Sequence, residues 1–182
     1  MNLLPQLETD DLALRPFTPG DARKVFAMSQ EEGIRKWMPS QVYRDEAHAA
    51  SVLATLAAQY RADIDLMTAP FVLGIELKSS GALVGHAGIS PLQGGLEVGF
   101  AVERSQQGKG IATLAVRTLC EWAAMTCPGT RILGIAAQEN NASQRVLMRS
   151  GFQRQAATEM LFQGREQPVV VFAYSAKIPP AI

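Results

Sequence analysis

Residues 96–102 read LEVGFAV, and after four intervening residues positions 107–113 read QGKGIAT. Because strand side chains alternate between the two faces of a sheet, the large apolar residues of 96–102 share one face, and Glu97 lies on the other. Residues 111–125 then carry apolar side chains at the spacing of an amphipathic helix. This stretch therefore predicts a strand, a glycine-containing loop and a helix in direct succession.

The loop contains two glycines, Gly108 and Gly110, directly before the predicted helix. Glycine lets a backbone turn tightly and approach a ligand with no side chain in the way. The first turn of the helix adds unpaired N–H groups and the positive end of the helix dipole. We therefore predict an anion site suited to a pyrophosphate at the backbone amides of residues 108–113. A plain helix-starting turn has the same local pattern, and neither a Walker loop nor a full dinucleotide fingerprint is present.

The strand before this loop carries a carboxylate among small residues, because Gly99 and Ala101 share the face of Glu97. A charged group on a central strand beside small side chains suggests a cavity on that face. The alternative is that this face of the sheet is simply exposed to water.

The rest of the chain alternates strands and helices in an order typical of a mixed sheet with helices on both faces, in the α/β (α+β) class. No stretch resembles a linker, so we expect residues 1–182 to form one domain. Residues 37–39 are expected to be irregular. We predict strands at 12–15, 71–77, 82–89, 96–102 and 131–137, helices at 19–28, 45–61, 111–125 and 140–150, and a final hairpin of 159–163 and 169–176.

The composition is that of a folded protein, with 47% apolar and 19% charged residues. Seventeen basic residues balance seventeen acidic ones, so no overall field favours a nucleic acid or an anionic membrane. The first sixteen residues lack a basic start and a long apolar core, and no apolar run is long enough to span a bilayer, so we expect a cytoplasmic protein. We interpret Cys120 and Cys127 as reduced thiols, and we expect no metal site.

Two sequence motifs, at residues 107–112 and 140–152, fit the patterns of one protein family. Gln107, Gly110 and Ala112 fit the pattern Gln/Arg-x-x-Gly-x-Gly/Ala between a strand and a helix. A second pattern, Asn-x-x-Ser followed by Gly-Phe, fits Asn140, Ser143 and residues 151–152. In these motifs, in their order and in the N-terminal Leu-Arg-Pro, the chain resembles the GCN5-related N-acetyltransferases (GNAT), in particular the RimJ and RimL branch of ribosomal-protein N-terminal acetyltransferases.

The chain also departs from that branch. Leu114 stands where a glutamate is usual, and Asp11-Leu12 replaces the usual Arg-Leu before the first strand. Neither change touches phosphate binding, but both leave the subfamily open.

The resemblance implies a single-domain GNAT fold with a mostly antiparallel sheet whose central strand pair splays apart to admit the pantetheine arm of CoA. Acetyl-CoA would be the acyl donor, with pantetheine amides paired to the backbone of Phe100 and Val102 as an added strand would be. Lys109 is a candidate for a CoA phosphate, against the alternative of a merely solvated lysine. The implied cofactor-binding residues are Phe100, Val102, Gln107, Gly108, Lys109, Gly110, Ile111, Ala112, Thr113 and Asn140.

The resemblance also assigns catalytic roles. An acid on the strand before the phosphate loop often serves as the base in this family, and Glu97 occupies that position. Ser143 matches a serine proposed as the proton donor to the leaving thiolate, while helix capping is the structural alternative for both Ser143 and Asn140. Glu159 is a rival base, since the branch carries a glutamate on the late strand, but a one-residue slip would move it to the other face.

We therefore expect an N-acetyltransferase that acetylates a primary amine, either a protein N-terminus or a small molecule, as a monomer or homodimer. The alternative is a non-catalytic acyl-CoA-binding module, which needs the phosphate loop but not the base, so Glu97 favours the enzyme. By resemblance, the acceptor is held by residues 31–43 and by the turn at 91–95. Trp37, Met38 and Tyr43 are candidates to line an apolar entrance, against the alternative of core packing.

Overall fold

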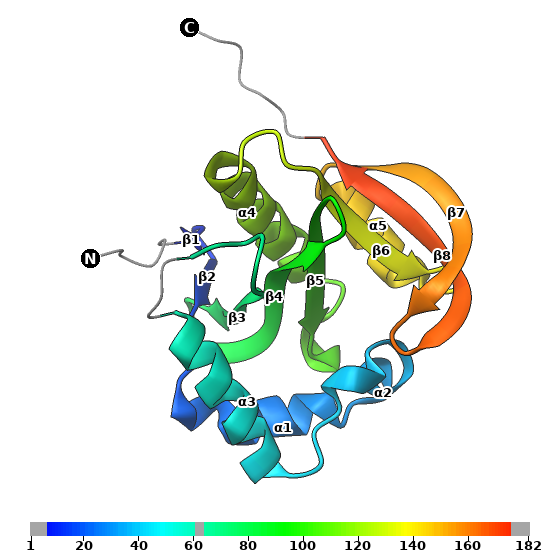
Figure 1. Ribbon diagram of the computed structural model, residues 1–182. Helices are drawn as coiled ribbons and strands as arrows, with labels where there is room; N and C mark the ends of the chain where they lie inside the picture. The colour runs from blue at the N-terminus through cyan, green and yellow to red at the C-terminus, as the bar shows by residue number, and fades with distance from the viewer. Residues whose placement is uncertain (1–6, 61–63, 176–182) are drawn as a thin grey trace, which may run out of the picture.

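The structure is a computed structural model that describes residues 7–60 and 64–175. Its centre is an open eight-stranded sheet in the order β1-β2-β3-β4-β5-β6-β8-β7, in which only β5 and β6 run parallel (Figure 1). The strands are β1 (Leu7–Glu8), β2 (Leu12–Arg15), β3 (Phe71–Leu77), β4 (Ala82–Leu92), β5 (Gly95–Val102), β6 (Ile132–Ala137), β7 (Phe152–Phe162) and β8 (Arg165–Tyr174).

Helices cover both faces of the sheet, as the sequence predicts. One face packs against α4 (Ile111–Thr126) and α5 (Asn141–Arg149), and the other against α1 (Ala22–Ser29) and α3 (Glu46–Gln59) (Figure 1). The remaining elements are α2 (Glu32–Trp37) and three short 3₁₀ turns, η1 (Pro19–Asp21), η2 (Pro39–Gln41) and η3 (Arg104–Gln106). No helix in the described part of the chain is both long enough and apolar enough to traverse a lipid bilayer.

The predicted splay of the central strands is present. β5 pairs with β6 only where Leu96–Val98 face Ile132–Gly134. β6 then continues to Ala137 along β8 instead. Among the strands that the structure describes, none therefore pairs with the β6-facing edge of β5 from Gly99 to Val102.

The core lies mainly between α4 and the sheet. Leu96 and Val98 of β5 are buried there against Val116 and Leu119 of α4. A smaller apolar cluster, with Val25, Leu53 and others, lies on the opposite face beneath α1 and α3. Because burying each such side chain stabilises a fold by roughly 1.5–3 kcal/mol, Leu96 and Val98 hold one face of β5 against α4.

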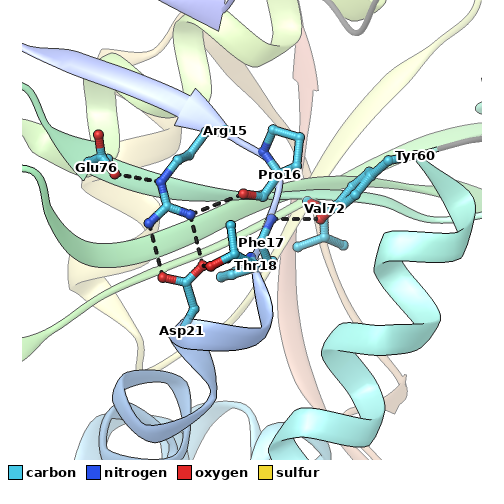
Figure 2. Close-up of polar contacts among 8 residues, drawn as sticks. All are labelled: Arg15, Pro16, Phe17, Thr18, Asp21, Tyr60, Val72 and Glu76. Atoms are coloured by element: carbon cyan, nitrogen blue, oxygen red, sulfur yellow. Dashed lines mark hydrogen bonds and ion pairs between the residues drawn. The ribbon is translucent and has the colours of Figure 1, made fainter.

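A network of polar contacts joins the N-terminal strand to the first helix (Figure 2). The guanidinium of Arg15 donates to both carboxylate oxygens of Asp21, at 2.8 and 3.0 Å, and to Glu76 of β3 at 2.5 Å. Asp21 also accepts hydrogen bonds from the backbone N–H and the hydroxyl of Thr18. Burial acts to raise the pKa of Asp21, but the hydrogen bonds from Arg15 and Thr18 outweigh it and hold the pKa below its ordinary value. The network fixes where α1 begins over the sheet.

Most predicted elements are confirmed, but three segments differ. The helix α2, residues 32–37, was not predicted, because at six residues it is too short to show a periodic apolar stripe. Of residues 37–39, predicted to be irregular, Trp37 ends α2, Met38 lies between elements and Pro39 begins η2. β1 was not predicted, because two residues carry no pattern. The final hairpin is longer than predicted, because most of β7 is exposed at the sheet edge and lacks apolar alternation. The predicted ends at Arg61 and Ala176 lie outside the described residues.

Candidate active site

A cavity of about 440 Å³ opens where β5 and β6 separate. Its walls come from β5, the loop before α4, the start of α5, and α2. Of the residues to which the sequence assigns cofactor binding or, for Glu97 and Ser143, catalysis, all except Lys109 line this cavity. These lining residues are Glu97, Phe100, Val102, Gln107, Gly108, Gly110, Ile111, Ala112, Thr113, Asn140 and Ser143.

The glycine loop has the backbone conformation that its sequence predicts. Gly108 and Gly110 adopt φ angles of 78° and 80°, in the left-handed region that favours glycine, and Gly110 is the N-cap of α4. A Cβ built on either glycine would meet nothing within 4 Å, so the space above the loop is open. Gln107 ties the loop to the end of β5, because its Nε2 donates to the carbonyl of Val102 at 2.9 Å. The loop therefore presents the amides of a helix N-terminus to open space.

Lys109 points elsewhere. Its Nζ donates to Gln106 Oε1 at 2.7 Å, and the side chain is exposed outside the cavity wall. The lysine thus helps to shape the loop in this conformation.

Glu97 lies on the face of β5 that carries Gly99 and Ala101, directly opposite Ser90 of β4. The carboxylate is partly buried, and burial raises its pKa above the ordinary value. Gly99, two residues along, is exposed, and a Cβ built there would meet nothing within 4 Å. The carboxylate therefore stands beside open space, as the small residues around it suggest.

Helix capping and a role in the site are the two alternatives for Asn140 and Ser143, and the hydrogen bonds at the start of α5 distinguish them. Asn140 is the N-cap, and its Oδ1 accepts a hydrogen bond from the backbone N–H of Ser143 at 3.1 Å. Within residues 7–60 and 64–175, the hydroxyl of Ser143 makes no hydrogen bond that caps the helix. The capping interpretation therefore holds for Asn140, while Ser143 lines the cavity and its hydroxyl does not cap the helix.

Glu159, the rival base, lies on the exposed edge strand β7 opposite Pro168 and does not line the cavity. The tip of its hairpin does reach the cavity, through Phe162 and Gln163. Gln163 Oε1 accepts a hydrogen bond from Ser40 Oγ of η2 at 3.0 Å, which joins the hairpin tip to the segment after α2 (Figure 1).

Two arginines of the cavity wall were not identified from the sequence. Arg145 and Arg149 are exposed on α5 and line the cavity, and the carbonyl of Arg149 accepts a hydrogen bond from Arg117 of α4 at 3.1 Å. Their spacing of four residues, in the helix that carries the Asn-x-x-Ser pattern, puts them on one face. That spacing is the feature of the sequence by which the two arginines could have been identified.

A family model for the acetyltransferase (GNAT) domain matches residues 11–153. The chain belongs to the GNAT family. An uncharacterized N-acetyltransferase of Bacillus subtilis (strain 168), YoaA, is 24% identical over 180 residues, which cover 97% of this chain and 99% of YoaA. The chain is therefore an acetyl-CoA-dependent N-acetyltransferase, as its motifs predict.

Solved GNAT structures share the fold. A putative ribosomal-protein-serine acetyltransferase from Vibrio cholerae superposes with a TM-score of 0.74 at 19% identity, covering 92% of this chain and 95% of that one. The ribosomal L7/L12 acetyltransferase RimL, in complex with CoA, gives a TM-score of 0.74 at 14% identity, with coverages of 91% and 94%. The neighbours of this GNAT fold thus include the RimL type of enzyme that the sequence resembles.

The structure also bears on metal-ion and cysteine chemistry in this GNAT enzyme. Among the residues that the structure describes, no group of three or more His, Cys, Asp or Glu side chains could hold a metal ion. Cys120 is buried and Cys127 partly buried, both as free thiols, and burial raises the pKa of Cys120, which makes it unreactive.

Proposed function

We propose that this GNAT enzyme acetylates a primary amine, with Glu97 as the general base. The observation that carries the proposal is the position of Glu97, partly buried in the wall of the cavity at which the free edge of β5 and the glycine loop meet. A non-catalytic acyl-CoA-binding module would need the loop but not a carboxylate beside it.

The cavity fits acetyl-CoA. Its pyrophosphate would be bound by the open amides of residues 108–113 at the start of α4, where the helix dipole favours negative charge. The pantetheine arm would pair with the unpartnered edge of β5 at Phe100 and Val102. Arg145 and Arg149 would add positive charge for the phosphates of CoA. Lys109 would reach a phosphate only by leaving Gln106.

The chemistry needs a neutral amine, because an ammonium ion has no free electron pair. Glu97 would accept the proton that the amine loses, and its raised pKa brings the carboxylate closer to the pH at which it works. The amine nitrogen then bonds to the acetyl carbon, and the bond from that carbon to sulfur breaks. Ser143 would supply the proton that the departing thiolate takes up, directly or through water. It would regain a proton through water from the acetylated nitrogen, which loses its second proton as the amide forms.

The acceptor is either a small amine or a protein N-terminus. The RimL neighbour acts on a ribosomal protein, which supports the second class by analogy only. We propose that residues 1–182 act as one cytoplasmic domain, as a monomer or homodimer.

The residues that the resemblance assigns to acceptor binding lie in two places. Trp37 and Met38 line the cavity described above, and Tyr43 lines a second cavity. The turn at 91–95 lines neither of these two cavities.

The test is a screen of amines and N-terminal peptides for thiol release from acetyl-CoA. Wild-type protein should release CoA thiol with at least one acceptor. The Glu97→Gln variant should release it much more slowly with the same acceptor. Glu159→Gln is the matched control, because this glutamate lies outside the cavity. Thiol release that depends on Glu159 and not on Glu97 would contradict the proposal.

A further inference from the structure

A second cavity, of about 300 Å³, lies between the sheet and the helices α1 and α3. Its volume is at the small end of the range for ligand pockets, about 300–1,000 Å³. Most of its wall is apolar. The principal side chains are Val25, Met28, Val52, Leu53, Leu56 and Val72.

The two cavities adjoin. Glu31, Ile34, Ala101 and Val102 line both of them. Ala101 shares its face of β5 with Glu97, and the open space at Gly99 lies between these two residues along the strand. A molecule that fills the second cavity can therefore extend one end toward the proposed base.

The side chain of His86, on β4, adds no positive charge to the second cavity at neutral pH. His86 lines the cavity opposite Ala101, and its Nε2 is buried without a hydrogen-bond partner among the described residues. Burial lowers the pKa of His86 to about 4, so the imidazole is neutral at neutral pH.

One carboxylate, that of Glu31, lies where the two cavities meet, and a second, that of Glu103, lines the second cavity. Glu31 lines both, and one of its oxygens accepts a hydrogen bond from the backbone N–H of Arg104 at 2.8 Å. Glu103 also lines the second cavity and is paired with Lys24 of α1. Lys24 already balances the charge of Glu103, so Glu31 and Glu97 are the carboxylates that complement the ammonium end of an amine. The neutral body of that amine complements the apolar interior.

We infer that the second cavity holds the body of the acceptor, and that the acceptor is a small primary amine on an uncharged aliphatic or aromatic body. This inference rests on the proposed acetyl transfer. A second ammonium group would have to be desolvated among apolar side chains, which is unfavourable. An extended peptide would leave backbone N–H and C=O groups unpaired against the same walls.

Three variants test the inference. Val52→Phe fills the cavity from α3, and Val52→Ala enlarges it with little risk to folding. Ala54→Phe is the matched control, since Ala54 is exposed on the same helix and lines neither cavity. The acceptors are pentylamine and cadaverine, which have the same five-carbon chain and differ in one terminal ammonium, together with phenethylamine and an alanine-initiated tripeptide.

Wild type should prefer pentylamine or phenethylamine to cadaverine and the tripeptide by at least about tenfold in kcat/KM. Val52→Phe should raise KM for the preferred amine by about tenfold or more, with the Kd for CoA unchanged. Val52→Ala should shift the preference toward phenethylamine, and Ala54→Phe should match wild type. Preference for cadaverine or the tripeptide, or equal behaviour of Val52→Phe and Ala54→Phe, would overturn the inference.

A binding measurement separates this inference from the proposed function. Calorimetry of phenethylamine and pentylamine with the CoA-loaded protein reports occupancy without turnover. If no amine is acetylated, the proposed function fails, yet binding that Val52→Phe removes and Ala54→Phe keeps still supports the apolar cavity as the amine site. If amines are acetylated but none of this binding depends on Val52, the inference fails and the proposed function stands.

Discussion

The side chain of Asn140 caps α5 through the backbone N–H of Ser143, at 3.1 Å, so the two polar residues of one motif have different tasks. Asn140→Ala should lower the free energy of unfolding by about 1 kcal/mol, because it removes the cap. Ser143→Ala keeps the capped N–H and should leave the melting temperature unchanged while it lowers turnover. Thermal unfolding and kcat of both variants check this, and a Ser143→Ala variant that melts early with full turnover per folded molecule would reverse the assignment.

The arginines of α5 should contribute to CoA affinity. Arg145→Ala and Arg149→Ala should each weaken CoA binding by roughly tenfold at low salt, since each removes a charged donor from the cavity wall. The loss should shrink at high salt. Arg154→Ala, at an exposed position of β7 outside the cavity, is the control in the same calorimetric titration. Equal affinity of all three variants would place the phosphates elsewhere.

A carboxylate in the glycine loop should abolish CoA binding. Gly110→Asp puts a negative charge into the proposed anion site, at a residue with φ of 80°. Gly81→Asp is a matched control, because Gly81 has φ of 66°, equally open surroundings and a place in the β3–β4 turn. Both variants should lose similar stability, and only Gly110→Asp should lose affinity for CoA in calorimetry. Loss of affinity in both would indicate a folding effect.

The Arg15–Asp21 pair should matter for stability and for its acid dependence. Because the pKa of Asp21 is held below its ordinary value of 3.8, its stabilisation is present above that pH and is lost as pH falls through the lower folded value. Asp21→Asn should lower the free energy of unfolding at pH 7 by roughly 1–3 kcal/mol, as hydrogen bonds to charged groups are weakened.

The control for that variant is the exposed Lys78–Glu8 pair, whose side chains are 41% and 50% accessible. Glu8→Gln should cost less than about 1 kcal/mol, because solvent screens such a pair. Denaturant unfolding at pH 7 and at pH 3 compares them. A smaller loss in Asp21→Asn than in Glu8→Gln would refute the structural role of the network.

The sequence identified the parts of the site that carry a pattern within a single segment, either the strand and loop of residues 96–113 or the Asn-x-x-Ser motif of residues 140–143. The strand that carries Glu97 and the loop with Gly108 and Gly110 are adjacent in the chain, so alternation and helix capping rules located them. Arg145 lies in the cavity only because α5 packs beside α4, and the second cavity needs α1, α3 and the sheet together. The four-residue spacing of Arg145 and Arg149 indicates that they share a helix face, but a single sequence does not show which distant segments that face meets.

Two alternatives that the sequence leaves open also have a physical explanation. Whether Ser143 or Asn140 caps α5 depends on a shift of a few residues at a helix start, where boundaries are least predictable. Whether Glu159 reaches the site depends on the register of an edge strand that carries little apolar alternation.

The pH dependence of acetyl transfer by wild type and Glu97→Gln tests the central claim most directly. With Glu97 as the base, kcat/KM for the amine in wild type should fall on the acid side through a pKa above the ordinary 4.5, since burial raises it. Glu97→Gln should lack that limb and be about a hundredfold slower near neutral pH, with unchanged affinity for CoA. A Glu97→Gln variant with the wild-type rate, or with the same acid limb, would show that another group takes the proton.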